Sequence, residues 1–178
     1  LVVDDCSEDN TKDIVKKYTK THKNIKLLSN EKNKGAYPSR NFGAKHSKGS
    51  LITIHDSDDW SHPQKIQLQA EALLSEKNII CTLSRWVRVT DNLKFIGSWF
   101  LNESFVEKNH SSSMIKRSVL EEIGYWDPVN VGGDTEFLWR LEHKYGSYAI
   151  KEILTDIPLS FSLVSSTSLT RTSSTHVK

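Results

Sequence analysis

Residues 50–63 read SLITIHDSDDWSHP and combine a strand-like run with a dense group of acids. The apolar residues 51–54 predict a buried strand, and Asp56, Asp58 and Asp59 follow it closely. Carboxylates this close oppose one another's ionisation unless a cation lies between them. Short acidic runs are often solvated loops or helix caps, but acids at the end of a buried strand favour metal or ribose binding. Oxygen ligands of this kind suit Mg²⁺ or Mn²⁺.

The chain on either side of this stretch alternates between strand and helix patterns. Short apolar strands are predicted at residues 1–3, 25–28 and 51–55, with helices at residues 10–22 and 38–47 between them. Helical crossovers of this kind imply an α/β fold with a mainly parallel, Rossmann-like sheet flanked by helices.

Apolar spacing predicts which faces of the helices are buried. In the helix at residues 10–22, we expect Ile14, Val15 and Tyr18 to face the core. A third helix is expected after residues 51–55, capped by Ser61 and with Pro63 at its first position. Its apolar stripe combines four residues: Ile66, Ala70, Leu73 and Leu74.

Two predicted strands end in acids, at Asp4-Asp5 and in the stretch that contains Asp56. Since ligands bind beyond the carboxyl ends of parallel strands, we expect both groups at the same edge of one sheet. On their own, Asp4 and Asp5 fit a strand-end turn in which aspartates bond backbone amides. The functional alternative is recognition of a nucleotide base or ribose.

From residue 79 the pattern changes to a smaller mixed-sheet region. A hairpin turn at Asp91-Asn92 separates strand-like residues 79–90 from residues 93–100. Further strands are expected at residues 110–115 and within 150–163, and helices at residues 118–123 and 134–145. The prediction is a single domain, with a nucleotide-binding half (1–78), an acceptor half (79–164) and a tail (165–178). We also expect the chain to be a fragment of a domain, without its first strand and part of its C-terminus.

Gly132 and Gly133 precede Asp134 at the start of the last predicted helix. By default an aspartate there caps the helix and is stabilised by the helix dipole. Alternatively, it is a general base behind a mobile glycine pair, which would permit close approach and loop closure. Spacing alone leaves both interpretations open, and Glu136 is a second acid in the same turn.

Bulk composition excludes several classes of protein. The net charge, 24 − 22 = +2, is too small to argue for nucleic-acid binding, and no apolar run is long enough to span a membrane. Cys6 and Cys81 are too few for a disulfide framework. A cytoplasmic protein is therefore expected, with peripheral association with a membrane as an option.

Four motifs in order resemble those of family 2 inverting glycosyltransferases, which have the GT-A fold. VVDDCSEDNT at residues 2–11 resembles the opening acidic segment of that family, and NKG with SRN at residues 33–41 resembles its second. Residues 54–63 resemble the segment that holds the DxD motif. GGDTEFLWR at residues 132–140 resembles the segment with the catalytic aspartate.

The resemblance implies a nucleotide-sugar donor, of UDP type, and a divalent metal, Mn²⁺ or Mg²⁺. Residues implied to contact the donor are Asp4, Asp5, Arg40 and Asp56. Asp58 or its neighbour Asp59 would bind the metal, which bridges the diphosphate and offsets the charge of the leaving group.

Asp134 is implied as the base that deprotonates a hydroxyl of a glycan or lipid-linked acceptor, with inversion at the anomeric carbon. One departure is Gly133, where the family often has Glu, and Glu136 is a rival for the base. A non-catalytic glycan- or nucleotide-binding module on the same fold is the main alternative. A nucleotidyltransferase is a third, against which the missing glycine-rich phosphate loop counts.

Overall fold

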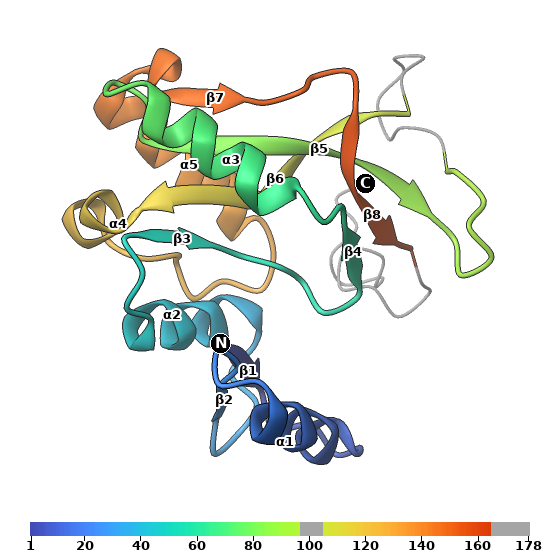
Figure 1. Cartoon of the computed structure of the whole chain (residues 1–178). Coiled ribbons are helices and arrows are strands. Elements are labelled where there is room, and N and C mark those ends of the chain that lie inside the picture. The colour runs from blue at the N-terminus through green and yellow to red at the C-terminus, as the bar shows by residue number, and fades with distance from the viewer. Residues whose placement is uncertain (97–104, 165–178) are drawn as a thin grey trace.

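The structure is a computed structural model that describes residues 1–96 and 105–164 (Figure 1). In chain order, its elements are β1 (Val2–Asp4), α1 (Thr11–Thr21), β2 (Leu27–Ser29), α2 (Ala36–His46), β3 (Leu51–Thr53), β4 (Asp59–Ser61), α3 (Lys65–Ser75), β5 (Cys81–Val89), β6 (Glu107–Lys116), α4 (Arg117–Ile123), α5 (Gly133–Tyr145), a 3-10 turn (Ser147–Ala149), β7 (Ile150–Glu152) and β8 (Pro158–Leu163). The predicted tail and part of residues 93–100 lie outside the described residues.

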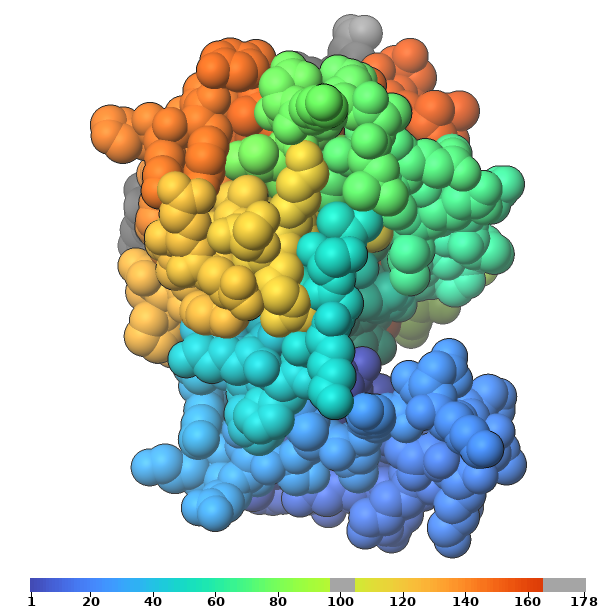
Figure 2. All heavy atoms as spheres, turned by 60° about the vertical axis from the view of Figure 1, so that its left-hand side comes forward, coloured from blue at the N-terminus to red at the C-terminus, as the bar shows by residue number. Residues whose placement is uncertain are grey.

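Strands β1 and β2 form a small parallel sheet, joined by α1 as the alternating pattern predicts. Helix α2 packs on β1, where a Cβ atom added to Gly43 would lie 2.9 Å from Val3 Cγ2. Figure 2 shows this N-terminal segment in blue as the lower part of the molecule, next to the cyan residues of α2.

The second sheet has the order β3-β6-β5-β8-β4, and β7 also pairs with β5. Its pairs β5–β7 and β5–β8 are parallel, whereas β3–β6, β5–β6 and β4–β8 are antiparallel. The α/β class is confirmed, but the pairing is mixed rather than mainly parallel. The acidic ends also do not share one sheet edge, because β1 pairs with β2 and β3 with β6, and no ladder in the described residues joins β1 to β3.

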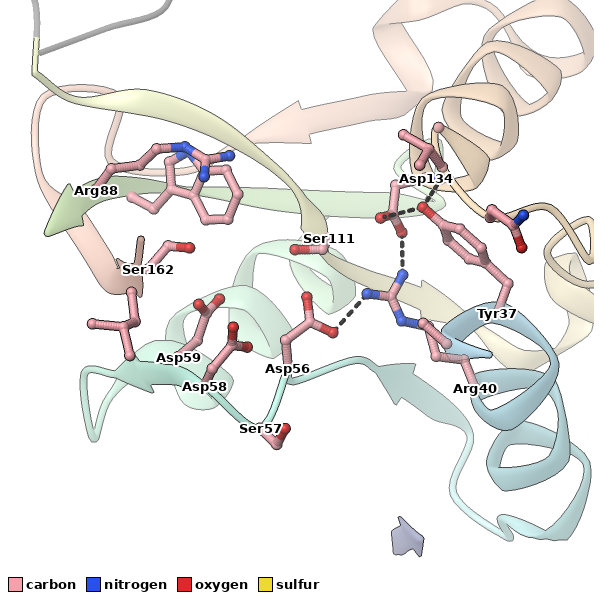
Figure 3. A pocket seen from close by; sticks show the side chains of 16 residues that line it. Tyr37, Arg40, Asp56, Ser57, Asp58, Asp59, Arg88, Ser111, Asp134 and Ser162 are labelled. Carbon is pink, nitrogen blue, oxygen red and sulfur yellow. Dashed lines mark hydrogen bonds and ion pairs between the residues drawn. The ribbon is translucent and has the colours of Figure 1, made fainter. Parts of the chain in front are cut away.

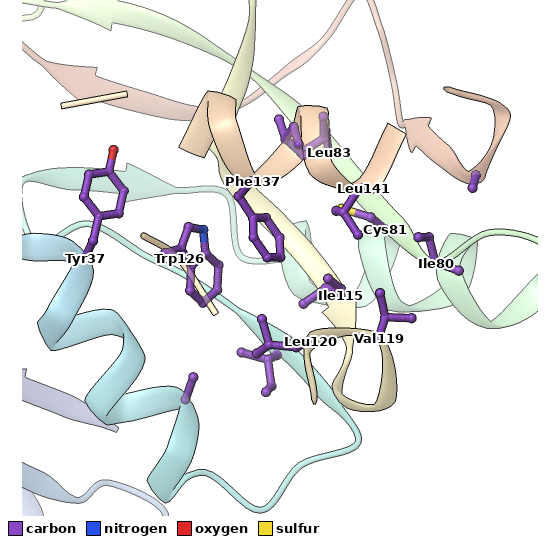
Figure 4. Close-up of a cluster of buried hydrophobic side chains, with 14 residues drawn as sticks. Tyr37, Ile80, Cys81, Leu83, Ile115, Val119, Leu120, Trp126, Phe137 and Leu141 are labelled. Atoms are coloured by element: carbon purple, nitrogen blue, oxygen red, sulfur yellow. The ribbon is translucent and has the colours of Figure 1, made fainter. Parts of the chain in front are cut away.

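The main core lies between the larger sheet and helices α4 and α5 (Figure 4). Phe137 and Leu141 of α5 are fully buried against Cys81 and Ile115 of the sheet. The rings of Trp126 and Phe137 stack with centroids 4.8 Å apart, which fixes the segment just before α5 against the helix. Helix α5, whose first residues reach the candidate site, is therefore anchored in the main hydrophobic core.

Helix α3 departs from its predicted boundaries and face. Asp59–Ser61 is a strand paired with β8, so Ser61 is extended rather than a cap, and the helix begins at Lys65. Its buried face consists of Lys65, Gln69 and Leu73, whereas Ile66 and Leu74 are exposed. Of the predicted stripe, Leu73 is buried and Ala70 half-buried, so the buried face is rotated from the predicted one rather than replaced.

The predicted buried face of α1 is also wrong. Ile14 and Tyr18 are exposed, Val15 is half-buried, and no residue of α1 is buried. The apolar stripe of this helix is present, but no described part of the chain covers it. No helix in the described ranges has the length and apolar character that crossing a membrane requires.

Candidate active site

A cavity of about 510 Å³ lies between α2, the loop after β3, strands β5 and β8 and the start of α5 (Figure 3). It brings together five of the predicted site residues: Arg40, Asp56, Asp58, Asp59 and Asp134. Asp4 and Asp5 are not among the residues that line it. The second and fourth sequence motifs, far apart in the chain, therefore meet the acidic stretch in one place.

Arg40 connects two of these acids directly. Its Nη1 donates to Asp134 Oδ1 and its Nη2 to Asp56 Oδ1, both at 2.6 Å. The guanidinium is nearly buried, and burial alone would lower its pKa. Asp134 and Asp56 together outweigh that effect and raise the pKa of Arg40 above its usual range. Arg40 is thus a permanent cation that fixes the spacing between the acidic stretch and α5.

Tyr37 is a site residue that sequence reasoning missed. Its hydroxyl donates to Asp134 Oδ2 at 3.2 Å, and its ring lies 5.0 Å from the Arg40 guanidinium carbon. Burial and the nearby charge of Asp134 raise the pKa of Tyr37. The signal was present, since positions 37 and 40 are three apart on one helix face.

The glycine pair has a structural explanation. A Cβ atom on Gly133 would lie 2.9 Å from ring atoms of Tyr37, so only glycine allows this close approach. Gly132 has φ 82°, in the left-handed region that disfavours larger residues. The pair thus lets the start of α5 approach the tyrosine ring.

Asp134 lies in the first turn of α5, but its carboxylate forms no capping bond to that helix. It faces Arg40 and Tyr37 instead, and its own backbone N–H donates to the Tyr37 hydroxyl at 3.3 Å. Glu136, the rival base, is paired with Arg140 at 2.7 Å and does not line the cavity. The arrangement therefore disfavours both the capping interpretation and the Glu136 alternative.

The acidic stretch carries charge that nearby residues only partly balance. Burial, together with repulsion from Asp56 and Asp58, raises the pKa of Asp59 to about 6, although a hydrogen bond with Ser162 opposes this. Lys65 at the start of α3 is buried near Asp59 and Asp56. Burial lowers the pKa of Lys65 despite these two acids.

The donor set fits a metal held partly by substrate. In the described residues, no three His, Cys, Asp or Glu side chains converge as a ready-made metal site. Asp58 is exposed and Asp59 half-buried on the same cavity wall. Mg²⁺ is commonly bound by one or two carboxylates together with phosphate oxygens and water, rather than by a cage of protein ligands. Asp58 and Asp59 fit that mode.

Asp4 and Asp5 organise the N-terminal segment. Asp4 is 2% exposed, accepts from Cys6 N at 3.1 Å and pairs with Lys12 Nζ at 3.2 Å. Asp5 accepts from Gly35 N and from Asn30 Nδ2, both at 2.7 Å. Their contact with a donor stays a prediction, and the turn-forming interpretation describes what both carboxylates do in this structure.

Comparison with known proteins identifies relatives across the chain. The family described as "Glycosyl transferase family 2" matches residues 1–141. An uncharacterized glycosyltransferase of Methanocaldococcus jannaschii, MJ1057, is 26% identical over 169 residues, which cover 86% of this chain and 57% of the relative. WfgD of Escherichia coli, named as a UDP-Glc:alpha-D-GlcNAc-diphosphoundecaprenol beta-1,3-glucosyltransferase, is 35% identical over 99 residues, covering 56% of this chain and 38% of that protein.

Among solved structures, S. aureus TarS 1-349 in complex with UDP-GlcNAc is similar, with a TM-score of 0.68 and 23% identity. The match covers 92% of this chain and 49% of that one. The likeness shows a shared fold and, with the family match, confirms the expected GT-A fold. The chain spans about half the length of the relatives it matches over most of its residues.

Proposed function

The chain belongs to glycosyl transferase family 2, and we propose that it transfers a sugar from a nucleotide-sugar donor to a hydroxyl group of an acceptor. The observation that carries this proposal is the pair of contacts by which Arg40 holds Asp134 and Asp56 across one cavity. A carboxylate suited to accept a proton thus lies beside an acidic stretch suited to a metal diphosphate. Within this proposal, residues 1–78 form the donor half and residues 79–164 the acceptor half.

The proposed donor is a UDP-sugar. Support comes from TarS, whose solved structures include complexes with UDP and UDP-GlcNAc, and from the name of WfgD, which specifies UDP-Glc. In this chain, Arg40 and Asp56 would contact the donor from one wall of the cavity. Arg88, which pairs with Glu107 at 4.0 Å and whose guanidinium carbon lies 4.5 Å from the centre of the Trp86 ring, lines the cavity with them and adds positive charge beside the proposed diphosphate position.

Asp58 and Asp59 would hold a divalent metal with the diphosphate. Such an ion acts as a Lewis acid and offsets the negative charge that develops on the leaving group. The closeness of Asp59 to Asp58 and Asp56 on one cavity wall supports this role, because a nearby cation would relieve the repulsion among the three acids.

The proposed chemistry is a single displacement with inversion. Asp134 accepts the proton of the acceptor hydroxyl, whose oxygen bonds to the anomeric carbon of the donor sugar. The bond from that carbon to the diphosphate oxygen breaks, and UDP leaves with the electron pair. Arg40 and Tyr37 hold one oxygen each of Asp134, and each oxygen retains a lone pair for the acceptor.

Glycan or lipid-linked acceptors are proposed because WfgD is named for a diphosphoundecaprenol acceptor and a Trichomonas vaginalis relative for a dolichyl-phosphate one. Such acceptors are consistent with an enzyme that acts on the cytoplasmic side of a membrane surface. This part of the proposal concerns the whole protein.

The decisive experiment is calorimetric titration with UDP, GDP, ADP and CDP, each with and without Mn²⁺, followed by assay of UDP-sugar turnover. We expect UDP to bind most tightly, with metal strengthening binding, and slow release of sugar from the UDP-sugar. Metal-dependent binding without any turnover would favour the non-catalytic module. No binding of any nucleotide would contradict the proposed function.

A further inference from the structure

A second cavity, of about 320 Å³, runs beside α5 and is separate from the donor cavity. We name it the α5 groove and define it by six of its lining residues: Lys108, His110, Thr135, Trp139, Glu142 and Glu152. Thr135, Trp139 and Glu142 are spaced so that they share one side of the helix. They extend over about 10 Å of helix axis, a length that accommodates more than one sugar ring.

The groove begins next to the proposed base. Thr135 directly follows Asp134, and its Oγ1 lies 3.4 Å from His110 Nδ1. Burial and then Lys108 lower the pKa of His110, while Asp134, Glu152 and Glu142 act in the opposite direction. The charges of Asp134 and of the two groove acids therefore act on the same histidine, His110. A chain-like ligand with one end at Asp134 would have its next units along α5.

The walls of the groove have the chemistry of a saccharide site. Trp139 is 66% exposed although it is the largest apolar side chain of α5 outside the core, so its indole offers a flat apolar face. Polar groups surround that face, as they do in sites that bind hydroxyl-rich ligands. A solvated helix surface would ordinarily carry a polar side chain at the position of Trp139.

The charges of the groove favour a neutral ligand. Lys108 and Arg85 share the carboxylate of Glu152, which Arg85 contacts at 2.7 Å. Glu142 adds a further carboxylate and is exposed. The two cations and two carboxylates leave the groove with no net charge to attract an anion, whereas sugar hydroxyls can donate to both glutamates.

We propose that the α5 groove binds neutral sugar units of the acceptor, with Trp139 as the stacking surface, while the reacting hydroxyl lies at Asp134. This inference rests on the proposed function and adds the class of acceptor and the place where it is held. It makes Trp139 a binding residue that determines the KM for the acceptor and leaves donor binding unaffected.

The test uses ¹⁵N-labelled protein saturated with UDP and Mg²⁺, so that the donor cavity is filled. Cellobiose, maltose and chitobiose are titrated separately while the indole N–H signals of the tryptophans are followed by NMR. We expect the Trp139 signal to shift with at least one disaccharide and the Trp60 signal to stay in place. Trp139→Ala should raise the Kd by about tenfold, the loss expected of one aromatic contact. Trp60→Phe, a change at another exposed tryptophan, should leave it unaltered.

Three outcomes overturn the inference. They are no shift with any disaccharide, unchanged binding in Trp139→Ala, or a Trp139 shift caused by glycerol phosphate but by none of the neutral sugars. The UDP titration separates these outcomes from failure of the proposed function. If one of these outcomes occurs while UDP still binds wild-type protein, only the groove assignment is wrong, whereas absence of UDP binding removes the function on which it rests.

Discussion

Arg40 of α2 donates to Asp134 of α5 at 2.6 Å, a contact between residues 94 positions apart in the chain. The second nitrogen of the same guanidinium contacts Asp56. One planar group therefore determines both where the proposed base lies and how far it is from the acidic stretch. Arginine suits this role because its donors form a rigid fork.

Replacing Arg40 by lysine should keep the charge and lose the fork. Because one ammonium group cannot hold Asp56 and Asp134 in the same geometry, we expect sugar transfer to fall by about 100-fold, with the melting temperature nearly unchanged. Steady-state assays and thermal unfolding of Arg40→Lys measure both. Arg117→Lys, which changes an arginine bonded to Gly49 and Ser47 outside the cavity, is the matched control. Activity of Arg40→Lys within threefold of wild type would show that the bridge is not needed.

Asp134→Asn should abolish transfer while UDP still binds. The amide retains an oxygen that can accept from Arg40 but is no longer a base, so the rate should fall by about 10³-fold or more. Glu136→Gln, two residues away and paired with Arg140 outside the cavity, should retain activity within a few-fold. A reversed pattern, with Glu136→Gln inactive and Asp134→Asn active, would move the base assignment to Glu136.

Tyr37→Phe removes the hydroxyl that bonds Asp134 and keeps the ring beside Arg40 and Gly133. We expect kcat to fall by about tenfold, since one hydrogen bond that orients the base is lost. The KM for the donor should hardly change. Tyr145→Phe, which removes a hydroxyl bonded to the exposed Glu122, is the control and should have wild-type kinetics. Equal kcat values for the two variants would argue against a positioning role for Tyr37.

Gln69 should be important for stability in a way that its neighbour Gln67 is not. Gln69 is fully buried and donates to the carbonyl oxygens of Thr82 and Ser112, on β5 and β6. Gln69→Leu leaves both carbonyl oxygens without that partner, and we expect the free energy of unfolding to fall by about 1–3 kcal/mol. Gln67→Leu, on the exposed face of the same helix, should change it by less than about 0.5 kcal/mol. Urea denaturation measures the difference, and equal values for the two variants would contradict it.

The lowered pKa of Asp5 predicts how the free energy of unfolding depends on pH. Although burial raises the pKa of this carboxyl, hydrogen bonds from Lys34, Asn30 and Gly35 outweigh that effect, and the folded pKa lies below the ordinary value of 3.8. A lowered pKa stabilises the fold fully above the unfolded pKa, and this stability is lost as pH falls through the folded pKa. Wild type should therefore lose its advantage over Asp5→Asn as the pH falls below about 4. Unfolding free energies of both proteins between pH 2.5 and pH 7 test this, and a constant difference would exclude it.

Local patterns predicted the order of elements well. Strand and helix periods gave β1 to α2 within a few residues, and the helices predicted at residues 118–123 and 134–145 end where expected, at Ile123 and Tyr145. The motifs placed Arg40, Asp56 and Asp134 in one site, and the structure brings them together. These features depend on residues close in sequence, or on motifs whose residue types carry the chemistry.

What could not be predicted depends on distant pairing. The strand at Asp59–Ser61 forms because Trp60 lies opposite Phe161, about a hundred residues later, and that pairing moves the start of α3. Leu73 is buried as predicted, but Lys65 and Gln69 rather than Ile66 and Leu74 complete the buried face. In the same way, helical spacing places Tyr37 beside Arg40, but only the distant position of α5 brings its hydroxyl to Asp134.

Helix α2 connects the small sheet with the cavity. Gly43 is seated against Val3 on β1, and Arg40, less than one helical turn earlier, reaches the cavity. A helix moves as a stiff body, so a bulkier residue in the small sheet would tilt the guanidinium without touching a single cavity residue. Laboratory evolution for a new donor should therefore recover substitutions around Val3 and Gly43 alongside those in the pocket itself.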